Sequence, residues 1–436
     1  MKNAHWKMAV LAGCGMLLSV TCLQAQDWPQ WRGPNRDAKA AGFNAPKEWP
    51  KELTQKWKVT VGGGDASPAL VGDKLYVFTR EGEDEIIRCL DAATGKEIWQ
   101  DKYEAKPAER PAGGIHAGPR STPTVADGKV VTLGVRGILS CLDAATGKEL
   151  WRKDDFKSWP QFYTSSSPIV VDNLCIAQLG GGMEGAIVAY DLATGDQKWK
   201  WAGESPGYAS PVLMSVNGTK LIVAETKNKI VAVAAADGKL AWEASFPTGQ
   251  MSYNASTPIV DGQTLIYGGD AGRGEKAVKI EKDGDRFMAK ELWSNPQTSV
   301  KFNSPVLRNG LVFGLTDRNQ FFAINAETGQ TAWTASAGGQ GGGGPAAKGG
   351  EGKKGGKGGM RGGRGGGGYG SIVDADSVLL ALTPSSELIV FQPSDKEFKQ
   401  LAKYKVASTP TYTYPVLSGN RIFIKDGDSV TLWTVE

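Results

Sequence analysis

Residues 89–99 read CLDAATGKEIW and residues 141–151 read CLDAATGKELW, so that ten of these eleven positions are identical. The pattern returns as AYDLATGDQKW, AVAAADGKLAW and AINAETGQTAW, which end at Trp199, Trp242 and Trp333. A degenerate copy ends at Trp293, and Tyr404 is expected to replace Trp in another. Successive Trp residues lie 40 to 52 positions apart, a period typical of one β-propeller blade. The chain is therefore organised as repeats.

Each repeat has the same order of apolar segments and turns. A Ser-Pro or Thr-Pro pair precedes a short apolar segment, and a polar turn and two further β-rich segments follow. In the last turn, Asp accepts backbone hydrogen bonds and Gly supplies a positive φ. The Trp four residues later offers a flat face to a neighbouring blade. The structural docking residues of this pattern are Trp57, Trp99, Trp151, Trp199, Trp242, Trp293 and Trp333.

The two ends of the chain decide the number of blades. Pro-led first strands begin near residues 68, 123, 168, 211, 258 and 305, a seventh near Ile372 and an eighth at Tyr414. The eighth repeat has three strands, whereas residues 53–61 carry Trp57 without strands of their own. Because open sheet edges are unfavourable, the N-terminal strand is expected to complete the last blade. The sequence thus predicts an all-β, eight-bladed propeller with four-stranded antiparallel blades over residues 53–436.

The A-x-D-x-x-T-G-x-x-x-W pattern resembles the repeat of the pyrroloquinoline-quinone (PQQ) propeller family, and the resemblance covers residues 53–436. That family includes quinoprotein alcohol dehydrogenases and the outer-membrane assembly lipoprotein BamB. WD40 propellers fit less well, because no repeat has Asp after its Trp. An N-terminal extension, residues 26–52, contains WPQWRGPNRDA at residues 28–38, which is similar to the opening of exported PQQ-like propellers.

Residues 1–25 are typical of a secretory signal peptide. Two lysines precede an uncharged, mostly apolar stretch, Met8–Cys22, and Ala25 is an acceptable cleavage residue. LAGC at residues 11–14 instead favours a lipid anchor at Cys14, and a retained N-terminal anchor is the third alternative. Each alternative predicts a periplasmic or extracellular protein. No later segment approaches the 18 apolar residues of a transmembrane helix.

Three cysteines follow the signal, Cys89, Cys141 and Cys175. An odd number in an exported protein is compatible with a reactive thiol or an intermolecular bridge. However, Cys89 and Cys141 occupy the strand position that Ala189 and Ala323 fill in other repeats. Buried, unreactive thiols are therefore expected.

Residues 338–370 are mostly glycine, with six basic side chains and one acid, and are expected to be a flexible insertion within the propeller. The tract and the signal account for the net charge of +4, so the propeller body is expected to be slightly acidic. An inert loop is the simplest interpretation, and contact with an anionic surface or polymer is an alternative. Arg-Gly-Gly at Arg361 and Arg364 is found in RNA-binding segments. Export and the lack of interleaved aromatic residues argue against a nucleic-acid partner.

Ligands of propellers usually bind where loops enter the innermost strands, at one mouth of the central channel. These loops supply an aromatic residue in most blades, either as a platform for a flat ligand or as packing of the rim. The candidate binding residues are Asp65, His116, Arg120, Tyr163, Tyr208, Tyr253, Asn254, Asn303 and Tyr412, with Thr164, Phe302 and Tyr369 in the same loops.

His116 is the only histidine after the signal, and a lone histidine cannot build a zinc site. A loop residue is the simplest interpretation of His116, and a general base is the alternative. No Ser-His-Asp or Cys-His arrangement is evident, so no catalytic residue and no metal site are assigned.

Family resemblance implies either of two functions. PQQ dehydrogenases need the quinone, Ca²⁺ held by carboxylate and amide oxygens, and a catalytic Asp, and several use a disulfide between adjacent cysteines. This sequence has no adjacent cysteines and offers only Asp65, Asn254 and Asn303 for such a site. The expected function is a non-catalytic binding or assembly scaffold without a cofactor, for a protein or envelope polymer. The alternative is a PQQ- and Ca²⁺-dependent oxidoreductase acting on alcohols or sugars, and hydrolases or sugar-binding proteins are less favoured.

Overall fold

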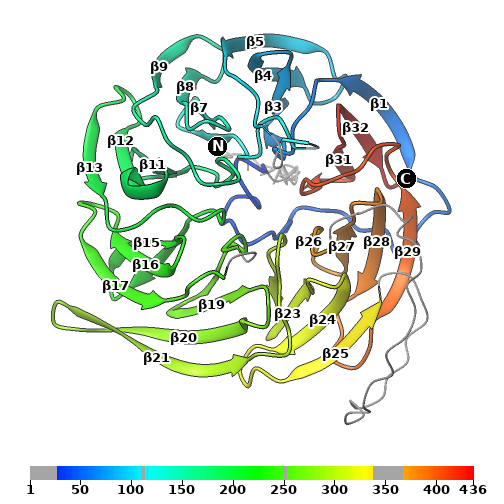
Figure 1. Cartoon of the computed structure of the whole chain (residues 1–436). Helices are drawn as coiled ribbons and strands as arrows, with labels where there is room; N and C mark the ends of the chain where they lie inside the picture. The colour runs from blue at the N-terminus through cyan, green and yellow to red at the C-terminus, as the bar shows by residue number, and fades with distance from the viewer. Residues whose placement is uncertain (1–26, 110–112, 115, 250–252, 337–366) are drawn as a thin grey trace, which may run out of the picture.

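Eight four-stranded antiparallel sheets form a ring around a central axis in the computed structural model (Figure 1). The structure describes residues 27–109, 113–114, 116–249, 253–336 and 367–436. The predicted signal, its alternative anchor Cys14 and most of the glycine-rich tract lie outside these ranges. The predicted eight-bladed propeller is confirmed. Within the described ranges, no helix has the length and apolar character of a membrane span.

The first four blades each run from the innermost to the outermost strand in chain order. Blade 1 consists of β2 (Ala69–Val71), β3 (Lys74–Glu81), β4 (Asp84–Asp91) and β5 (Glu97–Glu104). Blade 2 consists of β6 (Thr124–Ala126), β7 (Lys129–Leu133), β8 (Leu139–Asp143) and β9 (Glu149–Lys153). Blade 3 consists of β10 (Ile169–Val171), β11 (Leu174–Leu179), β12 (Ala186–Asp191) and β13 (Gln197–Trp201), with the short helix η1 (Gly182–Glu184). Blade 4 consists of β14 (Val212–Val216), β15 (Thr219–Glu225), β16 (Lys229–Ala234) and β17 (Leu240–Ser245).

The other four blades complete the ring. Blade 5 consists of β18 (Ile259–Asp261), β19 (Thr264–Gly269), β20 (Gly274–Asp283) and β21 (Arg286–Asn295). Blade 6 consists of β22 (Val306–Arg308), β23 (Leu311–Leu315), β24 (Gln320–Asn325) and β25 (Thr331–Ser336). Blade 7 consists of β26 (Ser371–Asp374), β27 (Leu379–Leu382), β28 (Glu387–Gln392) and β29 (Lys399–Lys405). Blade 8 consists of β30 (Val416–Ser418), β31 (Arg421–Lys425), β32 (Ser429–Thr434) and β1 (Thr54–Thr60).

Blade 8 is closed by the two ends of the propeller, as predicted. Strand β1 pairs antiparallel with β32, and Val59 lies opposite Val430 in this register. Figure 1 shows β1 as the outermost strand beside β32. This pairing removes the open edge that the three-stranded C-terminal repeat would otherwise leave.

The docking tryptophans link neighbouring blades. Trp151 Nε1 donates a hydrogen bond of 3.1 Å to the Leu192 carbonyl in the next blade, and Trp99 Nε1 donates one of 3.3 Å to Ala144. Gly147 has a φ of +75°, and a Cβ there would lie 2.5 Å from the ring of Trp99. Both the turn and the ring therefore require glycine at this position. Equivalent hydrogen bonds are donated by Trp57, Trp199, Trp293 and Trp333.

In blade 7, the expectation that Tyr404 replaces the docking Trp is wrong. Cys89 lies opposite Trp99 in blade 1, and Val390 lies opposite Ala402 at the same place before the bulge of blade 7. Ala402 therefore occupies the docking position. The buried Tyr404 instead donates a hydrogen bond of 2.6 Å to the Pro50 carbonyl.

The three described cysteines are free and buried, as expected. Burial raises the pKa of Cys89 to about 11 and that of Cys141 to about 12, and it raises the pKa of Cys175 further. Because the thiolate is the reactive form, these groups are inert core residues.

Residues 27–45, which we call the N-terminal plug, cross the axis at one end of the ring. Trp28, fully buried, exchanges backbone hydrogen bonds with Leu70 in blade 1. Arg36 donates hydrogen bonds of 2.8 and 2.9 Å to carbonyls of Pro168 and Ser167 in blade 3, and Arg32 donates one of 2.5 Å to Pro305 in blade 6. The plug therefore ties together blades that are not neighbours. Its role was not predicted from the sequence.

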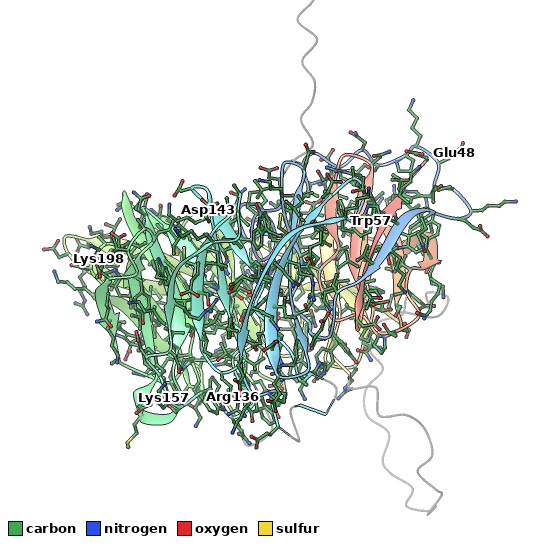
Figure 2. The ribbon with its side chains drawn as sticks, turned by 90° about the horizontal axis from the view of Figure 1, so that it is seen from above. Glu48, Trp57, Arg136, Asp143, Lys157 and Lys198 are labelled. Atoms are coloured by element: carbon green, nitrogen blue, oxygen red, sulfur yellow. The ribbon has the colours of Figure 1, made fainter. Side chains whose placement is uncertain are left out.

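The plug lies at the end of the ring that carries the turns between the first and second strands. The Asn44 amide donates a backbone hydrogen bond of 2.7 Å to the Gly419 carbonyl, which lies in such a turn of blade 8. Figure 2 shows Asp143, in a last-strand turn, near one end, and Arg136 and Lys157 near the opposite end. The loops that enter the innermost strands lie at this opposite end, which the plug does not cover.

Candidate functional site

Six aromatic rings form a continuous arc at the end of the ring opposite the plug. They come from the loops that connect the outermost strand of one blade with the innermost strand of the next. Centroids of neighbouring rings lie between 4.4 and 6.4 Å apart. We call this set the aromatic mouth, and it consists of Phe162, Tyr208, Tyr253, Phe302, Tyr369 and Tyr412. All six side chains are partly exposed.

Asp65 and His116 meet at the blade 8 end of the arc. The His116 Nδ1 and an Asp65 carboxylate oxygen lie 2.6 Å apart, and each side chain is 15% exposed. The His116 ring packs edge-on against Tyr412, with centroids 4.7 Å apart, and stacks on Tyr369 at 5.7 Å. This pairing orients the imidazole. Sequence analysis named both residues but did not pair them.

Arg120 stabilises the loop that carries His116. Its guanidinium donates a hydrogen bond of 2.7 Å to the His116 carbonyl and another to the Phe162 carbonyl. Burial lowers the pKa of Arg120, although the nearby Asp65 carboxylate acts in the opposite direction. Arg120 thus connects the two ends of the loop set and is itself partly exposed.

Tyr163 lies outside the arc, and its neighbour Phe162 lies within it. Tyr163 is buried, stacks on Trp159 with centroids 5.8 Å apart, and accepts a hydrogen bond from the Glu109 amide at 3.0 Å. The φ of Tyr163 is +67°, so the chain turns sharply between the two aromatic residues. Sequence spacing alone could not decide which of them faces the mouth.

The amide side chains of Asn254 and Asn303 hold their loops to the blades. Asn254 Nδ2 donates to the Thr226 carbonyl at 2.8 Å, and its Oδ1 accepts a hydrogen bond from the Arg273 guanidinium. Asn303 Nδ2 donates to the Leu315 carbonyl at 2.8 Å, and its Oδ1 accepts from the Leu315 amide at 3.4 Å. Both residues are buried and serve as structural clamps.

Several buried ionisable residues near the mouth were missed by sequence analysis, among them Glu225, Glu275 and Lys425. Neither carboxylate oxygen of Glu225 has a hydrogen-bond partner among the described residues, and burial raises its pKa well above the usual range. Burial raises the pKa of Glu275 to about 8. Burial lowers the pKa of Lys425 to about 8, and its Nζ donates to the Gly64 carbonyl at 2.5 Å. Glu225 and Lys425 are the last residues of apolar strands. An ionisable residue at the end of an apolar strand was the sequence signal that could have identified them.

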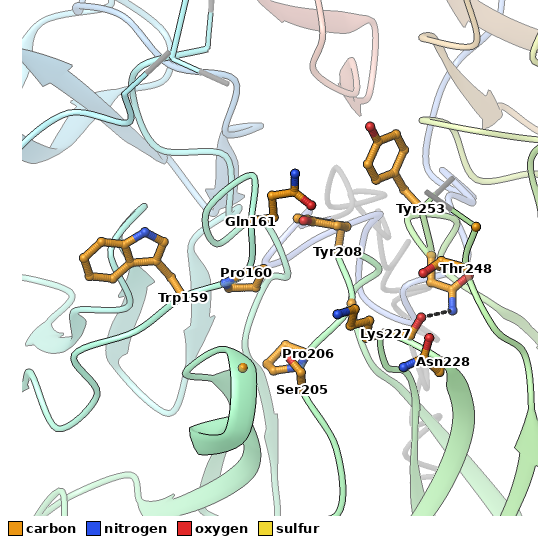
Figure 3. Close-up of a pocket in the computed structure, with 14 residues that line it drawn as sticks. Trp159, Pro160, Gln161, Ser205, Pro206, Tyr208, Lys227, Asn228, Thr248 and Tyr253 are labelled. Atoms are coloured by element: carbon orange, nitrogen blue, oxygen red, sulfur yellow. Dashed lines mark hydrogen bonds between the residues drawn. The ribbon is translucent and has the colours of Figure 1, made fainter. Parts of the chain in front are cut away.

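A pocket of about 490 Å³ adjoins the arc between blades 3, 4 and 5 (Figure 3). Its walls come from residues 159–161, 205–208, 227–228 and 253–254, together with Gly182, Thr248 and Gly249. Tyr208 and Tyr253 belong both to this pocket and to the aromatic mouth.

Comparison with known protein families shows which family contains these repeats. The family described as outer membrane protein assembly factor BamB matches residues 49–182 and 83–335, which together cover more than half of the chain. The chain belongs to this PQQ-like propeller family. The resemblance inferred from the repeat is thereby confirmed.

Both branches of the PQQ-like family occur among the relatives. BamB of Burkholderia pseudomallei (strain K96243) is 25% identical over 266 residues, which are 57% of this chain and 60% of that protein. Quinohemoprotein alcohol dehydrogenase of Comamonas testosteroni is 30% identical over 158 residues, 35% of this chain and 22% of the dehydrogenase. The chain thus spans less than two thirds of the length of each of these relatives.

Solved structures show the same fold. BamB from Moraxella catarrhalis superposes with a TM-score of 0.60 at 16% identity, covering 88% of this chain and 99% of that one. Quinohemoprotein alcohol dehydrogenase from Comamonas testosteroni superposes with a TM-score of 0.65 at 15% identity, covering 94% and 80%. At these identities the likeness concerns the fold, which hosts different functions.

The oxygens named from the sequence do not fit a Ca²⁺ site of the kind that PQQ dehydrogenases need. Asp65 is paired with His116, and the side-chain oxygens of Asn254 and Asn303 already accept hydrogen bonds. The positive charge of Arg273 at Asn254 Oδ1 opposes a cation there. Among the described residues, no three His, Cys, Asp or Glu side chains come together as a metal site.

Proposed function

We propose that this PQQ-like propeller is an exported, non-catalytic binding or assembly scaffold that holds a protein or envelope polymer at its aromatic mouth. The observation that carries this proposal is the arc of six partly exposed rings at the end opposite the plug. Aromatic side chains supply much contact area at a low cost in conformational entropy, and they are enriched among residues that dominate binding energy.

The arc is held in place before any partner arrives. Tyr208 Oη accepts a hydrogen bond of 3.1 Å from the Phe162 amide, and the rings of Phe302 and Tyr369 stack with centroids 4.4 Å apart. Backbone bridging between Phe302 and Tyr369 joins two successive loops. Preorganised rings lose little freedom on binding, which favours affinity. The name of the BamB relatives, assembly factors, and the secretory character of residues 1–25 support a scaffold in the envelope.

Partner capture by variants of the mouth tests the proposal. The combined variant Phe302→Ala, Tyr369→Ala and Tyr412→Ala should reduce partner recovery from the envelope fraction at least tenfold, as measured by quantitative cross-linking. The matched control replaces Ile98, Leu240 and Leu401, exposed apolar residues of outer strands, with Ala and should leave recovery unchanged. Equal recovery by the mouth variant and wild type would exclude the aromatic mouth as the binding surface.

The dehydrogenase alternative requires a separate assay. Purified protein is supplied with PQQ and Ca²⁺, and quinone absorbance and dye-linked oxidation of alcohols and sugars are followed. A scaffold should show neither. Micromolar or tighter PQQ binding with turnover that is lost in Asp65→Ala would establish an oxidoreductase instead.

A further inference from the structure

The pocket between blades 3, 4 and 5 has the size of a small-molecule site. Its volume of about 490 Å³ lies within the roughly 300–1,000 Å³ typical of ligand pockets. It opens beside the aromatic mouth, because Tyr208 and Tyr253 line both. A partner held at the mouth can therefore place one of its units in this pocket.

The wall carries little charge. Among the lining residues, Lys227 is the only one with a charged side chain, and it is exposed. Its backbone amide donates a hydrogen bond of 2.9 Å to the Ser205 carbonyl, which fixes the position of the Lys227 backbone against the next loop. Because no carboxylate lines this wall and Lys227 does, the wall favours a ligand that is neutral or carries a single negative charge.

The pocket wall contains both hydrogen-bond donors and acceptors. Gln161 presents an amide, and Ser205 and Thr248 present hydroxyl groups. Asn228 Nδ2 donates a hydrogen bond of 2.8 Å to Glu204, which turns its carbonyl oxygen away from that carboxylate. Each hydroxyl of a ligand both donates and accepts hydrogen bonds, so a mixed wall of this kind suits a ligand rich in hydroxyl groups.

One aromatic ring forms a flat side of the pocket. Tyr208 Oη accepts from the Phe162 amide, and the ring meets Tyr253 edge-on with an interplanar angle of 77°. Figure 3 shows the Tyr208 ring edge-on, with Pro206, Lys227 and Asn228 on one side of its plane. A ring face beside polar groups packs against the C–H face of a sugar while its hydroxyls reach the polar wall.

We propose that this pocket binds one sugar unit of a saccharide chain that is neutral or carries a single negative charge on that unit. The proposal rests on the proposed scaffold function and names the partner class: a glycan or polysaccharide. Tyr208 supplies the stacking face, and Lys227 and Asn228 contact the hydroxyl or carboxylate groups. A peptide at the same place is the alternative outcome of the test.

Binding of defined oligosaccharides to the purified full chain tests the proposal. The probes are neutral hexose oligomers, N-acetylhexosamine oligomers and oligomers that contain uronic acid, with unstructured peptides for comparison, measured by array and calorimetry. At least one saccharide class should bind with a sub-millimolar Kd, and Tyr208→Ala should weaken it at least tenfold. Lys227→Gln should weaken uronic-acid oligomers severalfold more than neutral ones if the bound unit is acidic, and should leave neutral ones within twofold.

Matched controls lie on the β20–β21 hairpin. Phe287→Ala and Lys290→Gln remove an aromatic ring and a lysine far from the pocket and should change no saccharide affinity. Binding of peptides but of no saccharide, or equal loss in Phe287→Ala and Tyr208→Ala, would overturn the sugar site. Tyr369 and Tyr412 do not line the pocket, and neither do Phe302 and His116, the rings that they pack against. A variant with Tyr369→Ala and Tyr412→Ala alone therefore reports on the scaffold function separately.

Discussion

At one end of the ring, Trp28 and the two arginines of the plug are buried against backbone carbonyls, whereas at the other end six aromatic rings remain partly exposed. The plug end consists of short turns that the repeat itself specifies. The mouth end consists of the loops between blades, and the repeat pattern does not determine their length or composition. The same scaffold therefore combines one end whose side chains stabilise the ring with one whose side chains are available for contact.

This difference predicts where substitutions should cost stability and where they should cost binding. Buried polar groups of the plug, such as Arg36 with its two carbonyl partners, leave those partners unsatisfied when removed. When a ring of the mouth is replaced by Ala, the contacts that are lost are partly exposed, and water can take the place of the ring. Stability should thus depend on the plug end, and partner affinity on the mouth end.

The largest effect is expected from deletion of residues 26–61, which removes the plug and β1 together. Blade 8 would be left with three strands and an open edge, so the protein should aggregate or lose its cooperative thermal transition. Solubility and circular dichroism during heating measure this. Deletion of residues 26–45 alone is the control and should lower Tm while keeping the protein soluble. An unchanged melting transition in the longer deletion would contradict closure through β1.

Substitution of one aromatic residue at each end compares the ends directly. Trp28 is fully buried, so Trp28→Ala should reduce the free energy of unfolding by about 3–5 kcal/mol. Tyr412 is partly exposed, and Tyr412→Ala should cost about 1 kcal/mol. Urea denaturation of both variants gives the two values. If the Tyr412 variant proves the less stable of the two, the assignment of stability to the plug end is wrong.

The buried acid Glu275 should make stability pH-dependent. Its pKa is about 8 in the folded protein, whereas an unfolded chain ionises it near pH 4.3. As pH rises between these values, the unfolded state loses its proton first, so the free energy of unfolding should fall and then level off above pH 8. Glu275→Gln should remove the part of this slope that Glu275 contributes, leave the part that the buried Glu225 contributes, and raise stability at pH 8 by a few kcal/mol.

The control for that series is Glu291→Gln, which changes an exposed glutamate on β21. Its stability should follow wild type at every pH. Denaturation at pH 5, 6.5 and 8 compares the three proteins, and parallel curves for Glu275→Gln and wild type would mean that Glu275 does not stay protonated in the fold.

The smallest effect is expected from replacing residues 338–366 with a four-residue linker. Ser336 pairs with Gln320, and the Gly368 amide donates a hydrogen bond of 2.8 Å to Asn319, so the two flanks of the tract lie close together. Loop-closure entropy depends weakly on length, and Tm should change by less than about 2 °C. A variant that fails to fold would show that the tract contributes to the propeller.

The repeat was enough to predict the blades, their strand order and the closure by β1. It was not enough for features that depend on contacts between distant segments. The Asp65–His116 pair joins loops 51 residues apart, and the plug binds several blades through side chains that follow no repeat. The shift from Tyr163 to Phe162 depends on a single positive φ, and in blade 7 the docking position holds Ala402, so that no aromatic residue marks it. Neither is encoded in spacing.

Closure by β1 and β32 also sets the order in which the molecule can be completed. Lys56 and Glu436 form an ion pair at 3.0 Å although they are 380 residues apart in the sequence. Strand β1 can therefore pair only after β32 has been synthesised, and such distant pairing is slow to form. Until β32 is available, β1 lacks its partner in blade 8 and the ring stays open.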